Sequence, residues 1–241
     1  MTFLSNLLLV LALLALFLDP GPRLRIPTRI RSWLRSRRTG AGASAAARAR
    51  QLRTPAVRIA DRLGIPTQRS RQADRWAAGA EGERRTAERL RTLEREGWTV
   101  LHDRALPGSR ANVDHLAISP AGRVYLPDTK RWSTRWPVTV RGGRLFHGDR
   151  DVTRRLDGLR HEAETVAAVL GVPVQPLVAM DGPALPDTGL TLAGLLIAPA
   201  DQLCAQLRHL DATERGPRRP QAQLAATAQR LLPAYTQGPR P

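Results

Sequence analysis

The chain is sharply divided in composition, and only one part of it can bury a core. Residues 1–75 carry 15 arginines against three aspartates, a net charge of +12, whereas residues 76–241 carry a net charge of only +5. The first part has few bulky apolar residues after its N-terminal end and a low-complexity stretch at residues 40–47. Such a composition cannot bury enough apolar surface to offset chain entropy. We therefore predict a flexible or partly helical basic linker over residues 19–75 and order from Trp76 onward.

The N-terminal end is a candidate membrane anchor. Residues 2–18 are apolar apart from Thr2, Ser5 and Asn6, and as a helix they would reach roughly 25 Å, the lower limit for a membrane span. A cleaved signal peptide is the alternative, but no basic region precedes the apolar run and no small-residue cleavage site follows it. All the arginines follow the run, so the positive-inside rule places the rest of the chain in the cytoplasm. We expect a transmembrane anchor at residues 1–18 and a single-pass cell-membrane protein with a cytoplasmic C-terminal domain.

The basic linker leaves three interpretations open. Its arginines could be attracted to anionic lipid headgroups, could contact nucleic-acid phosphates without sequence preference, or could form a solvated arm with neither role. The single cysteine, Cys204, excludes an internal disulfide and suits a reducing compartment. It lies in an apolar helical pattern, which favours packing over nucleophilic chemistry.

The remainder of the chain alternates between helical and strand patterns, which predicts an α/β domain over residues 76–210 and a C-terminal linker and helix over residues 211–241. The predicted elements, in chain order, are a helix at 76–96, strands at 98–102, 113–118 and 123–126, a hairpin at 138–141 and 144–147, a helix at 152–170, strands at 172–178 and 192–197, and helices at 201–210 and 221–232.

Two carboxylates and a lysine follow consecutive predicted strands. Asp114 lies five residues before the turn at residues 119–122 and Asp128 lies six after it, so an antiparallel hairpin can bring both to one edge of the sheet. Two such carboxylates repel each other unless a cation or proton lies between them. Lys130, the only lysine among 38 cationic residues, is two residues beyond Asp128 and projects from the same face of a strand. A metal ion and an ammonium beside a phosphate can orient and activate water for hydrolysis.

The first helix supplies one further candidate acid. Glu83 shares a helix face with Ala87 and Leu90 and is expected to point toward the sheet, whereas Glu81 shares its face with Arg84 and is expected to point to solvent. The alternative is that both glutamates simply favour the helix N-terminus through its dipole.

These residues lie within a series of short motifs that resembles the nuclease-related domain (NERD) family of the PD-(D/E)xK nuclease superfamily. The resemblance covers roughly residues 76–210, and the motifs follow the order and spacing of the family. They are Gly79-Ala80-Glu81-Gly82-Glu83, Gly97-Trp98, Leu101-His102-Asp103, Leu106-Pro107-Gly108, Asn112-Val113-Asp114-His115 and Asp128-Thr129-Lys130-Arg131-Trp132.

The resemblance implies a restriction-endonuclease-like α/β core, with a mixed central sheet flanked by helices, and a Mg²⁺- or Mn²⁺-dependent phosphodiester-cleaving site. By position, Glu83 is the helix acid, Asp114 the central metal ligand, Asp128 the second ligand and Lys130 the lysine of the superfamily. The expected function is a nuclease tethered to the cytoplasmic face of the membrane. The expected partners are nucleic acid, with DNA as the first expectation, and the membrane through residues 2–18.

Two departures keep an alternative open. Position 128 is Asp where many members have Glu, and Pro127 stands in a predicted strand, where it removes a ladder hydrogen bond. Either the strand kinks or bulges at Pro127, or the site is impaired. The alternative function is a catalytically degenerate module of the same fold that binds nucleic acid or a protein partner.

The other polar and aromatic candidates are weaker. His115 projects to the face opposite Asp114 and is expected to be packed. His161 and Glu162 face away from the apolar stripe of their helix and are expected to be solvated. Trp132 and Trp136 could stack on bases, although core or edge packing is the expectation for both.

Overall fold

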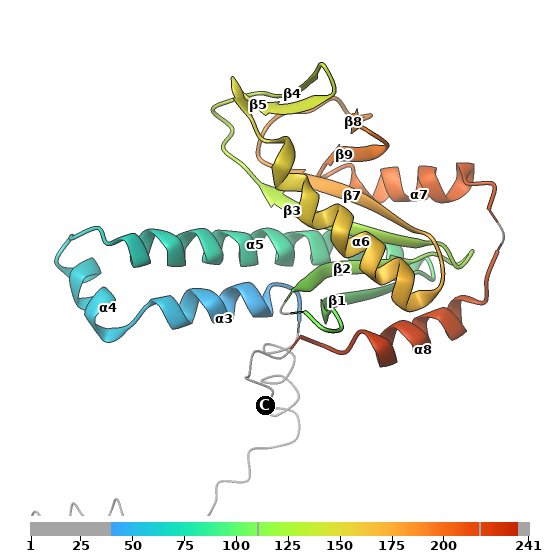
Figure 1. Ribbon diagram of the computed structural model, residues 1–241, viewed down its shortest axis with the longest axis horizontal. Coiled ribbons are helices and arrows are strands. Elements are labelled where there is room, and N and C mark those ends of the chain that lie inside the picture. The colour runs from blue at the N-terminus through green and yellow to red at the C-terminus, as the bar shows by residue number, and fades with distance from the viewer. Residues whose placement is uncertain (1–39, 110, 217, 236–241) are drawn as a thin grey trace, which may run out of the picture. The chain divides into compact units, whose positions relative to one another are not determined.

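The structure, a computed structural model, describes residues 40–109, 111–216 and 218–235 (Figure 1). The helices of this part are α3 (Ala43–Leu52), α4 (Pro55–Arg62), α5 (Gln68–Arg95), α6 (Asp157–Leu170), α7 (Leu203–Thr213) and α8 (Gln221–Leu231), and a short 3-10 helix, η1 (Thr153–Leu156), precedes α6. The strands are β1 (Thr99–Ala105), β2 (Asn112–Ile118), β3 (Val124–Arg131), β4 (Val138–Arg141), β5 (Arg144–His147), β6 (Arg150–Asp151), β7 (Val174–Asp181), β8 (Leu190–Leu192) and β9 (Leu195–Pro199).

The central sheet is mixed and has six strands in the order β1-β2-β3-β7-β9-β8. β1, β2 and β3 form an antiparallel meander, whereas β3 pairs parallel with β7 and β7 pairs parallel with β9. The connection from β3 to β7 runs through a separate three-stranded sheet, β4-β5-β6, and then through α6. The predicted α/β domain with a mixed central sheet flanked by helices is therefore confirmed.

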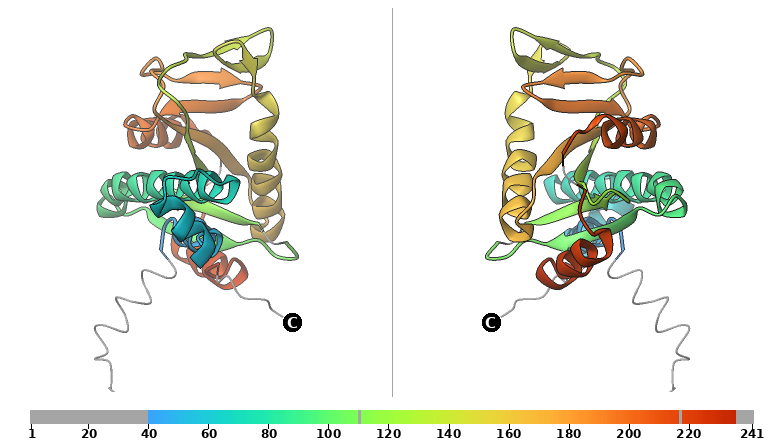
Figure 2. Two further views of the ribbon diagram at one scale, coloured as in Figure 1. Left: turned by 90° about the vertical axis from the view of Figure 1, so that its left-hand side faces the viewer. Right: turned by 90° about the vertical axis from the view of Figure 1, so that its right-hand side faces the viewer.

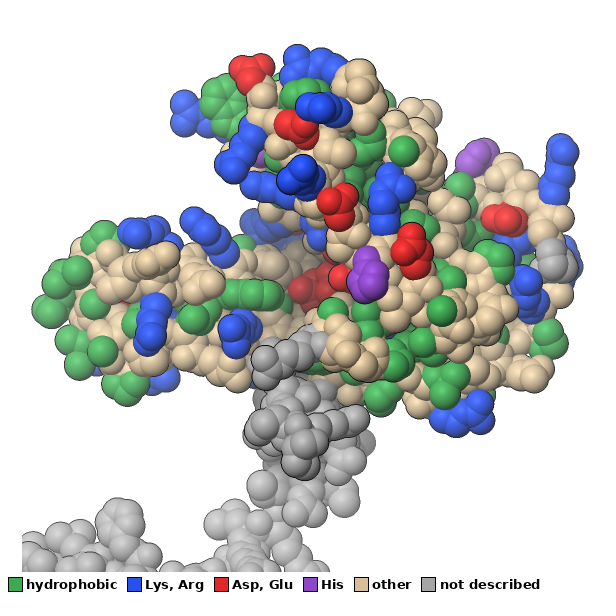
Figure 3. Space-filling model, viewed as in Figure 1, with side chains coloured by type: hydrophobic (Ala, Val, Ile, Leu, Met, Phe, Trp, Pro, Cys, Tyr) green, Lys and Arg blue, Asp and Glu red, His purple; other side chains and the backbone are tan. Residues whose placement is uncertain are grey.

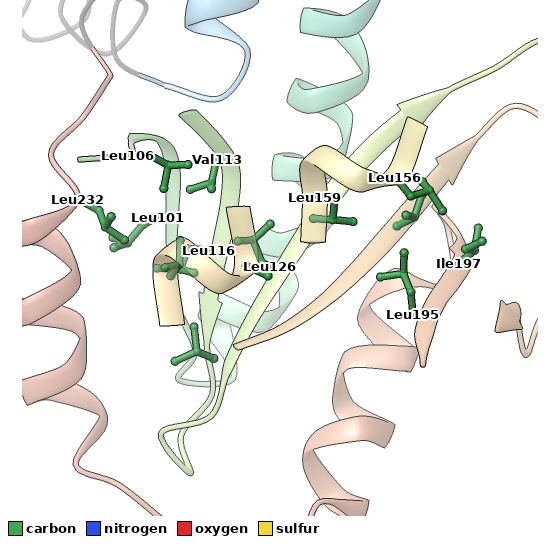
Figure 4. Close-up of a cluster of buried hydrophobic side chains, with 14 of the residues drawn as sticks. Leu101, Leu106, Val113, Leu116, Leu126, Leu156, Leu159, Leu195, Ile197 and Leu232 are labelled. Carbon is green, nitrogen blue, oxygen red and sulfur yellow. The ribbon is translucent and has the colours of Figure 1, made fainter. Parts of the chain in front are cut away.

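Helices cover both faces of this sheet (Figure 2). On one face, α6 and α8 pack on a cluster of buried side chains that includes Leu116 and Leu126. In Figure 4, Leu156 and Leu159 face the strands of this cluster. On the other face, Leu90 of α5 and the apolar residues of α7 pack on a second cluster. The two layers arise because successive strand residues point to opposite faces.

The strand alternation also decides which polar residues face α6. In β2, Leu116 and Ile118 belong to the cluster under α6 and α8, whereas Ala117 belongs to the cluster under α5 and α7. Asp114 lies close to both layers, because the charge of Glu83 on α5 and those of Asp128 and Glu162 act on its pKa in addition to burial. In β3, Leu126 places Asp128 on the α6 face.

The predicted start of order at Trp76 is wrong, because α5 begins at Gln68 and, within the described residues, α3 and α4 precede it. The described part of the predicted linker packs on α5 through alanines instead of bulky side chains: Ala43, Ala45 and Ala49 of α3 are buried. Gly42, with φ 72°, lies so close to α5 that an added Cβ would be 2.5 Å from the carbonyl oxygen of Ala80. A composition rule that counts bulky apolar residues does not detect a helix pair packed through alanine and glycine.

Most of the other predicted elements are present with shifted ends, and one is divided. The predicted strand at residues 192–197 is a hairpin of β8 and β9, which turns at Ala193 and Gly194, both with positive φ. The predicted hairpin of β4 and β5 has the bounds expected from its sequence. The long helix ends at Gly171, whose φ of 66° closes α6 in the left-handed region.

The predicted membrane anchor lies outside the described residues, as do residues 19–39 of the predicted linker. Among the helices of the described part of the chain, none is both long enough and apolar enough to cross a membrane.

Candidate active site

The site lies where β2 and β3 separate, and this place is called here the fork. The two strands pair only at Ala117–Tyr125 and Ile118–Val124, whereas β3 stays paired with β7 over its whole length from Val124 to Arg131. Pro127 is within this stretch and keeps its register opposite Leu177. The expected bulge at Pro127 is therefore absent from the β3–β7 ladder, and the antiparallel ladder ends on the β2 side instead. Proline has no backbone N–H to donate, but this loses no ladder hydrogen bond on the side of β3 where no strand is paired.

Asp114 and Asp128 stand on opposite sides of this fork. Extending the β2–β3 register by three residues beyond Ala117–Tyr125 sets Asp114 directly opposite Asp128. Asp128 is buried and Asp114 is half-buried. Desolvation, followed by the charges of Glu83 and Asp128, raises the pKa of Asp114 well above its usual value. The predicted juxtaposition of the two aspartates at one edge of the fork is what the register supports.

Lys130 forms an ion pair with Asp128, with 2.5 Å between Nζ and Oδ2. Burial lowers the pKa of Lys130, but the charge and hydrogen bond of Asp128 and the charge of Asp114 outweigh it, so the net pKa is raised. Lys130 is therefore an ammonium at neutral pH. It can act as a fixed cation and a hydrogen-bond donor, which differs from the role of a neutral lysine that accepts a proton.

Glu83 reaches the fork from α5, on the other face of the sheet. The helix lies close to β3, because Thr129 donates a hydrogen bond to Thr86 at 2.9 Å and because a Cβ at Gly82 would lie 3.2 Å from Thr129. Glu83 is only 7% exposed. Burial, followed by the charges of Asp103 and Asp128, raises the pKa of Glu83 to about 7. The expectation that Glu83 faces the sheet agrees with this geometry.

Glu81 has the opposite surroundings. Its carboxylate pairs with Arg84 at 2.7 Å and with Arg85 at 3.3 Å, on the exposed side of α5. The different surroundings of the two glutamates follow from the helical spacing that separates them.

Glu162 of α6 belongs to the same group of charges, and the sequence did not predict this. It is half-buried, and burial, followed by the charge of Asp128, raises the pKa of Glu162 to about 7. The expectation that it is solvated is therefore wrong, whereas His161 is exposed as expected. A signal was present in the spacing, because Glu162 is three residues after Leu159 and four before Val166, on the flank of the buried stripe.

A second polar cluster lies near the fork, because the charge of its Asp103 raises the pKa of Glu83 in addition to burial. Asp103 of β1 is fully buried with φ 49°. Its carboxylate accepts hydrogen bonds from the backbone N–H of Ser44 in the first turn of α3, at 2.9 Å, and from the side chain of Asn112, at 2.8 Å. Desolvation raises the pKa of Asp103. Asp103 therefore caps α3 and ties it to β1 and β2.

His115 is packed, as predicted. Its ring is fully buried, and its Nδ1 lies 2.8 Å from the Nδ1 of His102 on β1, so one of the two rings donates to the other. Burial, followed by His102, lowers the pKa of His115 well below its usual value. The pair is therefore neutral at physiological pH and lies on the sheet face opposite Asp114.

The arrangement fits a small divalent cation that shares its coordination with water and substrate. Among the described residues, Glu83 Oε2 has no hydrogen-bond partner, and Asp128 Oδ2 has none apart from its ion pair with the Lys130 ammonium. Within the described residues, no three Asp, Glu, His or Cys side chains form a group that could hold a metal ion by themselves. Mg²⁺ usually takes one or two protein carboxylates and completes its shell with waters and phosphate oxygens. In Figure 3, acidic side chains lie in a hollow beside α5, with arginine and lysine side chains above it.

The chain was compared with protein families, curated proteins and solved structures. No curated protein and no solved structure gave a significant match to the chain. Residues 78–180 match the family model of the nuclease-related domain (NERD). This segment contains all five charged residues of the fork, namely Glu83, Asp114, Asp128, Lys130 and Glu162. The match lies within the residues whose motifs resemble this family, so the resemblance found in the sequence is confirmed for residues 78–180.

Proposed function

We propose that the domain at residues 76–210 hydrolyses nucleic-acid phosphodiester bonds with Mg²⁺ or Mn²⁺, on a core of the restriction-endonuclease type. The observation that carries the proposal is the fork between β2 and β3, where Asp128 forms an ion pair with the Lys130 ammonium and lies close enough to Asp114 for its charge to act on it. The pKa of Asp114 and that of Glu83 are both raised. Buried carboxylates with raised pKa values that lie close together are typical of functional sites, because a bound cation offsets their repulsion.

Each residue of the fork has a separate role in this proposal. Asp114 and Asp128 would hold the divalent cation, and Glu83, whose Oε2 has no hydrogen-bond partner among the described residues, would supply a further acidic oxygen. A bound cation of this kind supplies Lewis acidity and lowers the pKa of a coordinated water. Lys130, held by Asp128, donates hydrogen bonds to the scissile phosphate or to the attacking water. Glu162 lies close enough to Asp128 and Lys130 for their charges to act on it, and it orients that water or accepts its proton.

Cleavage by the full-length chain in detergent tests the proposal. Plasmid, linear duplex, single-stranded DNA and single-stranded RNA are incubated with Mg²⁺, with Mn²⁺ or with EDTA. We expect cleavage of at least one substrate with metal and none with EDTA, and we expect Asp114→Asn to reduce the rate at least ~100-fold. Equal rates for wild type and Asp114→Asn would attribute the cleavage to a contaminant and contradict the proposal.

A degenerate domain that only binds nucleic acid or a protein is the second candidate. The observation that favours it is the lack, in the described residues, of three acidic or imidazole side chains arranged to hold a metal ion. It predicts that wild type cuts no substrate with any metal, yet retains nucleic acid or a protein partner in a pull-down. Metal-dependent cleavage that is lost in Asp114→Asn would rule this candidate out.

We also propose that residues 2–18 tether the domain to the cytoplasmic face of the membrane, and that the arginines that follow attract anionic lipid. The support is the apolar run with arginines on one side only. The protein should sediment with membranes, and its C-terminus should be protected from protease added outside intact cells. Full-length protein in the soluble fraction, or cleavage of the C-terminus from outside, would contradict this topology.

A further inference from the structure

Within residues 76–241, the net positive charge is concentrated in one segment next to the fork. Residues 131–155, called here the basic segment, contain seven arginines and two aspartates, a net charge of +5. Residues 76–241 as a whole also have a net charge of +5, so the rest of that region is neutral overall. The basic segment begins directly after Lys130, contains β4, β5, β6 and the start of η1, and leads into α6, which carries Glu162.

The charge is available to a ligand, because most of it is exposed and little of it is neutralised. The arginines are exposed, and among the described residues only two of the seven form ion pairs with acids: Arg144 with Asp151, and Arg131 with Asp181 at 3.8 Å. In Figure 3, Lys and Arg side chains gather over the region of β4 and β5, above the hollow that contains the acidic residues. A polyanion bound there would pass close to the fork, which alone would repel it.

Aromatic rings hold three of these guanidinium groups in place. Arg141 lies over Phe146 at 4.2 Å from the ring centre, and Arg135 lies over Trp136 at 5.2 Å. Arg155 lies over Trp132 at 5.5 Å. A guanidinium that rests on a ring keeps its N–H groups free at the edge, so it can still donate to a phosphate.

The two tryptophans of the basic segment differ in exposure. Trp132 packs against the hydrophobic core and against His147, as the sequence suggested. Trp136 is instead 50% exposed, although it is a large aromatic residue. It rests on the backbone at Gly148, where an added Cβ would lie 3.4 Å from the tryptophan side chain. Trp136 therefore has the backbone of Gly148 against one part of its side chain and the Arg135 guanidinium over its ring, and half of the residue remains exposed to solvent.

We propose that the basic segment binds a single-stranded stretch of the nucleic-acid substrate, with phosphates on its arginines and an unpaired base stacked on Trp136. The assignment rests on the proposed function, because it concerns the substrate of the same fork. Arginines track any phosphate backbone, but an indole on the protein surface can stack only on a base whose face is open. Bases within a duplex are already stacked on their neighbours, so Trp136 favours a single strand, an overhang or an unwound region.

Binding measured in EDTA tests this proposal without any cleavage. The full-length chain in detergent is titrated into a labelled single-stranded oligonucleotide and into a duplex of the same length. Trp136→Ala should weaken single-strand binding about 5- to 100-fold, because stacking of one base is worth ~1–3 kcal/mol. It should leave duplex binding nearly unchanged. The arginines of residues 1–75 are the same in wild type and in Trp136→Ala, so their contribution to the binding of each nucleic acid is common to both proteins.

Two variants control for effects that are not specific to stacking. Trp76→Ala removes the other exposed tryptophan of the described residues, which is 42% exposed and lies on α5, and it should change neither affinity. Trp136→Phe should restore most of the loss, because a phenyl ring also stacks. A loss that is equal for single strand and duplex, an equal loss in Trp76→Ala, or no loss in Trp136→Ala would each overturn the proposal.

The outcome also separates this proposal from the proposed nuclease activity. If wild type cuts nucleic acid but Trp136→Ala binds single strands normally, only the assignment of Trp136 fails. If Trp136→Ala loses single-strand binding but wild type never cuts, the binding surface stands and the nuclease activity fails.

Discussion

At the scale of single residues, the site holds several buried carboxylates close together, which is unfavourable in free energy when they are all charged. Lys130 offsets part of the repulsion between Asp114 and Asp128. Burial, followed by the charges of nearby carboxylates, raises the pKa of Glu83 and that of Glu162. The raised pKa of Lys130 keeps it charged. What distinguishes it from the 37 arginines of the chain is therefore the size and shape of its cation rather than its charge.

Replacement of the only lysine tests that distinction. Lys130→Arg should lose cleavage about as severely as Lys130→Ala, on the order of 100-fold or more, because the wide guanidinium cannot take the place of a compact donor beside a bound water. Rates measured at saturating Mg²⁺ decide this, and metal binding should largely survive in both variants. Wild-type activity in Lys130→Arg would show that only the positive charge matters at this position.

The residue that sequence analysis missed makes a separate prediction. Glu162→Gln should reduce kcat ~10- to 100-fold and flatten the acidic side of the pH–rate profile, since a pKa of about 7 suits a group that accepts a proton near neutral pH. Glu164→Gln is the matched control, because Glu164 is exposed on the same helix. Equal behaviour of the two variants would remove Glu162 from the site.

At the scale of elements, sequence patterns predicted what local rules govern. The turn at residues 119–122 and the alternation of two strands were enough to predict that Asp114 lies near Asp128. In the structure β2 and β3 pair only next to this turn, and the charge of Asp128 acts on the pKa of Asp114 after burial and the charge of Glu83. The helix pair α3–α5 could not be predicted in this way, because it is packed through alanines and Gly42. The position of Glu162 likewise depends on how α6 lies on the sheet, which is a tertiary property.

The contact between α3 and the sheet predicts which residue stabilises this arrangement. Asp103→Ala should lower the free energy of unfolding by on the order of 2–4 kcal/mol, because it leaves the Ser44 N–H and the Asn112 amide without their buried acceptor. It also places alanine at a φ of 49°. Asp103→Asn should cost clearly less, since asparagine keeps an acceptor oxygen and tolerates this conformation. Denaturant titration of both variants gives the comparison, and equal losses would contradict the capping role.

At the scale of the whole molecule, residues 76–241 contain an acidic fork and a basic segment, and without the basic segment this region has no net charge. The acidic part reduces the stability of the metal-free protein. A carboxyl whose pKa is raised in the folded state stabilises the fold fully below its ordinary pKa, near 4.5 for Glu83, and this contribution is lost as the pH rises through about 7. Glu162 acts in the same direction.

Stability in EDTA should therefore fall between pH 5 and pH 8. Glu83→Gln should flatten this dependence and raise the free energy of unfolding at pH 8 by on the order of 1–3 kcal/mol relative to wild type. Glu88→Gln, on the exposed side of α5 where Glu88 pairs with Arg91, should not do so. Thermal or denaturant unfolding at the two pH values provides the comparison, and a Glu83→Gln protein less stable than wild type at pH 8 would contradict the proposed repulsion.

The central claim is that the fork between β2 and β3 holds a divalent cation, and a Mn²⁺ titration followed by electron paramagnetic resonance tests it most directly. Wild type should show one saturable site. Asp114→Asn should lose it, whereas Glu81→Gln, which changes a solvent-facing carboxylate paired with arginines, should retain it. Equal Mn²⁺ binding by wild type and Asp114→Asn would contradict the account.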